Sequence, residues 1–329
     1  RHCEILSKAH FADLVAVCDV VQERAEATGN KYGVPWYLDV EEMIAAQEPD
    51  VINVLTPSGL HGRHVLQVAP LVENIVVEKP ITLDLAEADR VIERCEELDR
   101  RLFVVMQNRF NRPVVKLREA LTEGRFGELF LGTVRVRWSR NQAYYDQDEW
   151  RGTWDMDGGV LGNQASHHLD LLEWMMGEAD TVSAYTSTQF VDIEVPTTVV
   201  ATVAFKSGAL GVVEATTSTR PKDLEGSLSV LGSMGSAEIG GFAVNRVRHW
   251  RFAPPLPGDD EVMAGYSENP PNVYGYGHAK YLEHVANCIL HGEERLVGGV
   301  EGRRSLELIR AIYESASTGR HIKVHQVRN

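Results

Sequence analysis

Glu78, Lys79 and Pro80 directly follow an apolar stretch, Ile75–Val77, in the segment ENIVVEKPITL. The apolar stretch predicts a buried strand. Proline should end the strand pairing, because it lacks an N–H donor and pushes the preceding residue toward an extended conformation. Lys79 should therefore stand at the carboxyl end of a strand, where open α/β sheets bind their ligands.

A second candidate group lies in GGVLGNQASHHLDLL, residues 158–172. If a helix begins near residue 163, then Asn163, His167 and Asp170 share one face of it. The glycine pair ahead of the helix permits close backbone approach to a ligand. A histidine at a helix start is more often structural, but this combination with a strand-end lysine favours a reactive site.

Lysine and histidine side chains that converge on one carbinol could oxidise an alcohol. One group takes the hydroxyl proton, and the other holds positive charge against the developing alkoxide. We therefore pair Lys79 with His167 as the candidates for this chemistry.

Two further segments follow predicted strands. Asp19, at the end of DLVAVCD, either binds ribose hydroxyls of a dinucleotide or caps a helix that starts near Gln22. The turn from Thr56 through Pro57 to His61 should line a cofactor crevice. His61 and His64 have no third ligand nearby in the sequence, so capping or surface histidines are expected and no metal site is predicted.

The segment SRNQAYYDQDEWRGTWDMD, residues 139–157, is dense in tyrosine, tryptophan and arginine. Aromatic rings can stack on sugars, and arginine binds carboxylate or phosphate oxygens with two donors. The same composition also suits a surface loop in a subunit contact, with its arginines paired to nearby acids. Both interpretations stay open.

The elements that position these residues alternate in the first part of the chain. Strands are expected at 14–18, 50–55, 73–78 and 102–106, and helices at 22–33, 39–47, 61–70 and 84–99. Strands that alternate with helices predict a Rossmann-type, doubly wound parallel sheet. Because residues 1–11 read as a helix, we expect the first strand and its glycine-rich turn to precede Arg1.

After about residue 126 the pattern changes to long alternating runs, which predict a mostly antiparallel, open-faced sheet. The runs cover 127–138, 180–190, 197–205, 209–218 and 227–233, with helices at 165–176, 277–291 and 301–317. The proline-rich segment 253–273 is expected to be a long loop. We therefore predict two domains, 1–126 and 127–329, the second of them α+β.

Composition limits the partners of this protein. A net charge of −14 argues against nucleic acid and anionic membranes, both of which require basic surfaces. No apolar run reaches the length of a membrane span. The four cysteines are scattered without a CxxC pair, which predicts free thiols and a cytoplasmic location.

Taken in order, these motifs resemble the glucose-fructose oxidoreductase/inositol dehydrogenase/rhizopine catabolism (Gfo/Idh/MocA) family over nearly the whole chain. The resemblance is carried by TPSGLH (56–61), EKP (78–80), QNRF (107–110), GRFGEL (124–129), EWRG (149–152), GGVLGNQASHHLDLL (158–172) and SLELIRAIYESASTGR (305–320). It implies NAD as the cofactor, a small-molecule sugar or nucleotide-sugar substrate, a homo-oligomer (a dimer or a tetramer), and a Lys79–Pro80 peptide that is often cis.

The resemblance also implies roles for individual residues. The expected catalytic residues are Lys79, Asn163 and His167. The expected cofactor-binding residues are Asp19, Thr56, Pro57, His61, Glu78, Lys79, Gln107, Trp150 and Arg151. The expected substrate-binding residues are Lys79, Arg109, Arg140, Tyr145, Trp154, Asn163, Gln164 and His167.

Asn163 departs from the family pattern, because many members have aspartate there. An amide cannot accept a proton, so Asn163 should orient the substrate and His167 should act as the base. The Asn163-Gln164 variant is similar to a subgroup that oxidises C3 of UDP-linked N-acetylglucosaminuronic acid in surface-polysaccharide assembly. The alternatives are a free-sugar or inositol dehydrogenase, and a non-catalytic cofactor or sugar sensor.

Overall fold

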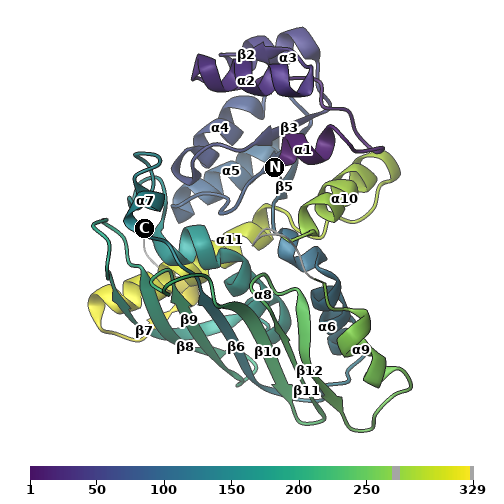
Figure 1. Cartoon of the computed structure of the whole chain (residues 1–329), viewed down its shortest axis with the longest axis vertical. Helices are drawn as coiled ribbons and strands as arrows, with labels where there is room; N and C mark the ends of the chain where they lie inside the picture. The colour runs from purple at the N-terminus through teal and green to yellow at the C-terminus, as the bar shows by residue number, and fades with distance from the viewer. Residues whose placement is uncertain (269–274, 327–329) are drawn as a thin grey trace.

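A computed structural model describes residues 1–268 and 275–326 of the chain. Two α/β units lie one above the other along the long axis of the molecule (Figure 1). The smaller unit contains the N-terminal part of the chain. The larger unit is built on a large sheet at the opposite end of the molecule. This arrangement agrees with the predicted fold class.

The N-terminal unit contains two parallel sheets, one ordered β1-β2 and one ordered β3-β4-β5. Its strands are β1 (Val17–Cys18), β2 (Trp36–Tyr37), β3 (Val51–Val54), β4 (Asn74–Val77) and β5 (Arg101–Val104). Its helices are α1 (His2–Leu6), α2 (Gln22–Tyr32), α3 (Val40–Gln47), α4 (His61–Val68) and α5 (Leu85–Glu97). The expected alternation is confirmed, although β2 is too short to stand out in the sequence.

Strand β4 positions Lys79 as the sequence predicted. All four of its residues are buried, and the Glu78 N–H still donates to the Val54 carbonyl at 3.0 Å. The Lys79–Pro80 peptide is cis, as expected. Beyond it, Asp84 caps α5 by accepting from the Glu87 N–H at 2.8 Å.

The second unit is built on an eight-stranded sheet ordered β12-β11-β10-β6-β9-β8-β7-β13. All neighbours are antiparallel except β6 and β9. The strands are β6 (Leu129–Arg137), β7 (Ala179–Ser187), β8 (Thr198–Phe205), β9 (Leu210–Thr216), β10 (Glu225–Gly232), β11 (Gly235–Gly240), β12 (Arg246–Phe252) and β13 (Ile322–Lys323).

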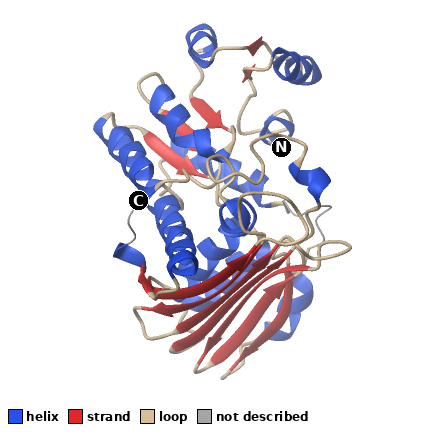
Figure 2. Cartoon of the chain, turned by 90° about the vertical axis from the view of Figure 1, so that its left-hand side faces the viewer, coloured by secondary structure: helices blue, strands red, loops and turns tan. Residues whose placement is uncertain are grey.

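Helices cover one face of this sheet and leave the other open (Figure 2). The helices of this part of the chain are α6 (Arg112–Thr122), α7 (Gln142–Tyr145), α8 (Ser166–Met176), α9 (Asp259–Gly265), α10 (Gly277–His291) and α11 (Gly299–Thr318). Burial alternates along β8, as the period-two pattern requires. On the open face, apolar side chains such as Tyr185, Val200 and Leu210 are exposed.

Helices α10 and α11 join the two units. Tyr281 and Val285 of α10 pack in one buried cluster with Phe103 and Val105, which lie on and beside β5. Leu306 of α11 belongs to the core of the N-terminal unit. The division at residue 126 therefore remains a prediction, because the end of the chain packs on both units.

The sequence pattern did not indicate four of the strands, β2, β11, β12 and β13, or three of the helices, α6, α7 and α9. Strands β11 and β12 are rich in Gly, Ser and Arg, and only Ala237, Ile239, Val247 and Trp250 carry their apolar pattern. Helix α6 was not assigned, and α9 lies within the loop expected at 253–273, of which residues 269–273 fall outside the described residues. Within the described ranges, no helix combines the length and apolar character needed to cross a membrane.

Candidate active site

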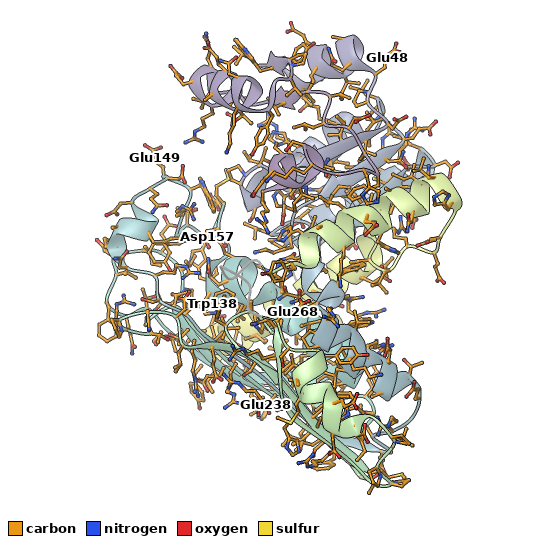
Figure 3. The ribbon with its side chains drawn as sticks, turned by 45° about the vertical axis from the view of Figure 1, so that its right-hand side comes forward. Glu48, Trp138, Glu149, Asp157, Glu238 and Glu268 are labelled. Atoms are coloured by element: carbon orange, nitrogen blue, oxygen red, sulfur yellow. The ribbon has the colours of Figure 1, made fainter. Side chains whose placement is uncertain are left out.

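A cleft of about 720 Å³ lies between the two units. From the N-terminal unit it is lined by residues that follow strands: Thr56 and Pro57 after β3, Glu78 and Lys79 after β4, and Gln107 after β5. The second unit contributes Trp138, Arg140, Tyr144, Trp150, Arg151, Asn163, Gln164 and His167. Trp138 and Asp157 mark this region in Figure 3. The cleft therefore opens at the carboxyl ends of parallel strands, where such sheets bind ligands.

Lys79 spans the cleft, because its Nζ donates to the backbone carbonyl of Asn163 in the other unit. Burial lowers the pKa of the ammonium group, and the charges of Glu78 and Asp157 oppose that shift. No ion pair joins Lys79 to a carboxylate among the described residues. Its cation is therefore stabilised by a carbonyl and by two acids at a distance.

His167 lies in the first turn of α8 and is 7% exposed. Its Nδ1 is buried and has no hydrogen-bond partner in the described part of the chain. Burial, followed by the positive charge of Lys79, holds its pKa well below the usual value. The ring is therefore neutral at pH 7 and can accept a proton.

Asp157 holds Asn163 in place and was not foreseen. Its carboxylate accepts from the Asn163 side chain at 3.0 Å and from the backbone N–H groups of Gly152 and Gly159 at 2.9 and 3.1 Å. Burial raises its pKa, and these three donors oppose the rise. The available signal was an acid directly before the glycine pair in WDMDGG.

Gln164 connects this network to the aromatic wall of the cleft. Its amide donates to the Tyr144 hydroxyl at 3.0 Å and to the Asn163 side-chain oxygen at 3.1 Å. The side chains of Tyr144 and Asn163 therefore have fixed orientations in the cleft.

The glycine pair is required by the protein's own packing. Gly158 and Gly159 both have φ near +74°, which disfavours other residues. A Cβ at Gly158 would lie 2.5 Å from Leu83 Cδ2, and one at Gly159 would lie 2.6 Å from the Tyr313 hydroxyl. The pair thus lets the segment before α8 pack against its neighbours.

The helix containing Asn163 and His167 differs from the expected one. Val160–Ala165 form a π-helix, and the α-helix begins only at Ser166. The wider π turn changes the register, so Asn163 and His167 line the cleft and Asp170 does not. The shared face predicted for all three residues is therefore wrong for Asp170.

The substrate-binding role expected for Arg109 is not supported by its position. Its guanidinium donates twice to Asp170, at 2.6 and 2.8 Å, and both side chains are almost fully buried. Ser305 also donates to Asp170, at 3.1 Å. Arg109 lies outside the cleft that contains Lys79, and sequence alone could not reveal a partner 61 residues away.

Arg140 and Arg151 line the cleft, but both are also paired. Arg140 donates to Asp223 at 3.1 Å, and Arg151 donates to Asp148 at 3.1 Å. The Arg151 guanidinium lies 4.5 Å from the ring centre of Tyr144 and 4.6 Å from that of Trp150. Arg151 therefore pairs with an acid of its own segment, as the second interpretation expected, while binding of a ligand by this segment stays a prediction.

Lys222 is a cleft cation that the sequence analysis missed. It lies in the loop between β9 and β10, lines the cleft and has no ion pair among the described residues. In the sequence, Lys222 belongs to the segment RPKD, residues 220–223, a turn between two alternating runs, and this turn could have indicated it.

Two other expected substrate ligands lie outside the cleft lining. Tyr145 is buried, and its hydroxyl is 3.1 Å from the Thr217 hydroxyl. Trp154 packs edge-on against Tyr313, with its backbone N–H donated to Glu194. Both residues support the walls of the site and do not face its interior.

Residues expected to bind the cofactor fit NAD in two respects. Asp19 follows β1, and one of its carboxylate oxygens accepts from the Val21 N–H at 2.8 Å. The N-cap of α2 is Val21 and has no side-chain hydrogen bond, so Asp19 does not cap this helix. The Gln107 side-chain oxygen is buried at the cleft without a partner among the described residues, so it is available to a donor such as an amide. Arg24 donates to Asp148 at 3.2 Å.

His61 is buried and also lines the cleft, so it is not the surface histidine that was expected. Its Nδ1 lies 2.7 Å from the Pro80 carbonyl oxygen, and its Nε2 lies 2.8 Å from that of Thr56. The ring therefore ties the turn after β3 to the turn after β4. His64 contacts the Thr56 hydroxyl at 3.0 Å.

One cluster of three side chains in the described ranges has ligand atoms close enough to hold a metal ion. His2, Glu78 and His278 each place one such atom within 4.8 Å of the others. Neither histidine was singled out from the sequence, and no metal had been predicted.

Two models of one protein family together match most of the chain. Residues 1–106 match the Gfo/Idh/MocA "Oxidoreductase family, NAD-binding Rossmann fold", and residues 118–324 match its "C-terminal alpha/beta domain". Myo-inositol 2-dehydrogenase of Thermotoga maritima is 28% identical, over 99% of this chain and 95% of its own length.

Two solved structures are more similar in sequence. The WlbA dehydrogenase of Bordetella pertussis, in complex with NADH and UDP-GlcNAcA, is 37% identical with a TM-score of 0.90, covering 98% of this chain and 93% of that one. The WlbA dehydrogenase of Chromobacterium violaceum, in complex with the same two molecules, is 37% identical with a TM-score of 0.91, covering 98% and 91%.

Replacing Asp170 with alanine should lower the free energy of unfolding by about 3–5 kcal/mol, because the buried Arg109 guanidinium loses its carboxylate. Urea unfolding followed by tryptophan fluorescence measures this loss. Glu97→Ala, which breaks the exposed pair with Arg94, is the control and should cost less than about 1 kcal/mol. An Asp170→Ala protein of unchanged stability would contradict the structural role of Arg109.

Proposed function

Because this chain belongs to the Gfo/Idh/MocA oxidoreductase family, we propose that it oxidises C3 of UDP-N-acetylglucosaminuronic acid with NAD as cofactor. The observation that carries the proposal is the meeting of Lys79 and His167 in one cleft, from different structural units. Oxidation of an alcohol requires a neutral base, here His167, and a positive group that stabilises the alkoxide, here Lys79.

His167 acts as the base. A neutral imidazole can take the hydroxyl proton, and burial beside Lys79 keeps the His167 pKa low enough for the ring to be neutral. Asn163 cannot accept a proton, so it orients the sugar through an amide held by Asp157. The reacting hydroxyl lies between these side chains.

Lys79 stabilises the alkoxide that develops as His167 takes the proton. Its Nζ is already held at the Asn163 carbonyl, so little reorganisation is needed to bond a sugar oxygen. NAD, when bound, supplies the hydride acceptor. Asp19, Glu78 and Gln107 are the residues we assign to holding it.

The anionic substrate is supported by cations placed in the cleft. A chain of net charge −14 repels anions at long range, so an anionic ligand requires local positive groups. Arg140, Arg151 and Lys222 supply them, next to the aromatic rings of Tyr144 and Trp150. The two WlbA structures support the same substrate, because each holds UDP-GlcNAcA in a protein that is 37% identical.

A free polyol such as myo-inositol is the second candidate substrate. It is favoured by the inositol dehydrogenase from Thermotoga maritima, which matches 99% of this chain. Lysine and histidine would serve any secondary alcohol, so the distinction depends on the arginine and lysine groups of the opposite wall. A non-catalytic sensor would not need a neutral histidine beside a lysine.

We also propose a cytoplasmic homo-oligomer, a dimer or a tetramer. The four cysteines form no disulfide, which agrees with a reducing compartment. The apolar side chains on the open sheet face offer surface for a second copy of the chain.

Lys79→Ala and His167→Ala should each lower kcat by about 10² or more, because each removes one partner of the acid–base pair. NADH formation at 340 nm measures kcat, and the quenching of tryptophan fluorescence measures cofactor affinity, which should be largely kept. Lys206→Ala, at an exposed lysine, is the control. Near-normal turnover by either cleft variant would contradict the assigned roles.

NAD should be preferred over NADP, because the Asp19 carboxylate would repel a 2′-phosphate and accept from both ribose hydroxyls. The ratio of kcat/KM for the two cofactors measures the preference. Asp19→Ser should shift that ratio toward NADP, and the exposed Asp13→Ser should not. A wild-type preference for NADP would end this assignment.

UDP-N-acetylglucosaminuronate should be oxidised in preference to myo-inositol and glucose, because only the nucleotide sugar presents anionic groups to Arg140, Arg151 and Lys222. Lys222→Ala should raise KM for this substrate with a smaller change in kcat, because the group binds at a distance from the reacting carbon. Initial rates of NADH formation on the three substrates test this. Turnover of the free polyols alone would overturn the substrate assignment.

A further inference from the structure

Glu78 is held by two histidines from distant parts of the chain. His2 comes from α1 and His278 from the first turn of α10. The Glu78 Oε1 atom lies 3.1 Å from His2 Nε2 and 3.7 Å from His278 Nε2. Both histidines are 3% exposed, so the contact lies at the buried side of the cleft.

The orientation of the Glu78 carboxylate is therefore fixed. Its second oxygen, Oε2, accepts from the Lys79 backbone N–H at 3.1 Å. His2 is held in turn by Asn53, whose Oδ1 lies 3.3 Å from His2 Nδ1. Glu78 thus makes its contacts with the histidines and the backbone, while the Lys79 side chain donates to Asn163 instead.

This arrangement places a negative charge near Lys79 without engaging its ammonium group. The histidine donors hold the pKa of Glu78 well below its usual value, although burial alone would raise it. The resulting carboxylate opposes the lowering of the Lys79 pKa by burial. A direct ion pair would supply the same charge but would occupy the Nζ that the reaction needs.

We propose that His2 and His278 are positioning residues, which hold Glu78 as an oriented carboxylate and thereby keep Lys79 a cation that is free to bond the reacting oxygen. This inference rests on the proposed alcohol oxidation. Neither histidine needs to contact the sugar, because both act through Glu78.

The same cluster is a poor site for a divalent cation. One of the two Glu78 oxygens is committed to the backbone of Lys79, whose ammonium group adds positive charge nearby. Glu78, with only the more distant Asp157 to assist it, would then have to balance both the metal ion and Lys79. Hydrogen bonds from the ring N–H groups of the two histidines satisfy the Glu78 carboxylate without the charge of a metal ion.

Other titratable groups surround the two side chains and enter any pH profile. His61, His167 and Tyr281 interact electrostatically with Glu78, and Asp157 interacts with Lys79. They remain unchanged in His2 and His278 variants, so a shift between those variants and wild type reports on the histidines.

The first test is the pH dependence of kcat/KM, measured with an alcohol that the wild type oxidises. Without the donors, the half-buried Glu78 becomes easier to protonate, and Lys79 then loses its counter-charge. Because Lys79 acts as the ammonium form, activity falls as pH rises through its pKa. His2→Ala and His278→Ala should therefore move the alkaline limb to lower pH, by about one unit.

Matched variants separate positioning from loss of folding. His2→Gln and His278→Gln keep an N–H donor and should recover part of the shift, while His10→Ala, at an exposed histidine, should cause none. In a Glu78→Gln background, His2→Ala should add no further shift, because the carboxylate on which it acts is gone. An unchanged alkaline limb in both alanine variants, or full additivity with Glu78→Gln, would overturn the proposal.

A readout independent of turnover distinguishes this proposal from the proposed function. In protein labelled with ¹³Cε-lysine, the Lys79 signal is assigned by its absence from Lys79→Arg and titrated by NMR. The Lys79 pKa should be lower in His2→Ala than in wild type, even if the sugar substrates fail. An equal Lys79 pKa in the two proteins would contradict the role assigned here. So would a wild-type protein that binds one zinc ion per chain, if the His2→Ala protein no longer binds it.

Discussion

A half-buried cation without a direct carboxylate partner is the constraint on which this site depends. Removing an ammonium group from water is costly unless opposite charge or hydrogen-bond acceptors replace the solvent. Lys79 meets that requirement with the Asn163 carbonyl and with the fields of Glu78 and Asp157. Its charge is thus supported while Nζ stays available to a substrate. The same cation helps to keep His167 neutral, so the acid–base difference between the two side chains follows from one electrostatic arrangement.

The fold delivers the parts of this arrangement from both units. The carboxyl end of β4, the central strand of its sheet, brings Glu78 and Lys79 to the cleft. The π-helix ahead of α8 turns Asn163 and His167 toward the same cleft. Helix α10 packs on the N-terminal unit through Tyr281 and Val285, which also places His278 against Glu78. The packing of α10, which joins the units, thus also brings a side chain to the site.

Local patterns predicted the parts of the site that depend on nearby sequence. The position of Lys79 followed from an apolar strand ended by proline, and α5 lies within the helix expected at 84–99. Contacts between distant segments could not be read in the same way. Arg109 looked like a substrate ligand because nothing nearby in sequence indicates Asp170, and His2 and His278 gave no local signal of their meeting at Glu78. The π-helix similarly moved Asp170 off the face predicted for Asn163 and His167.

The protonation states of Lys79 and His167 are the central claim of this account, and neutron diffraction from deuterated crystals at pH 7 observes them directly. The account predicts three deuterons on Lys79 Nζ, with one of them directed at the Asn163 carbonyl, and a single deuteron on the His167 ring. A neutral Lys79 amine beside a doubly protonated His167 would contradict it, because the base and the cation would then have exchanged places.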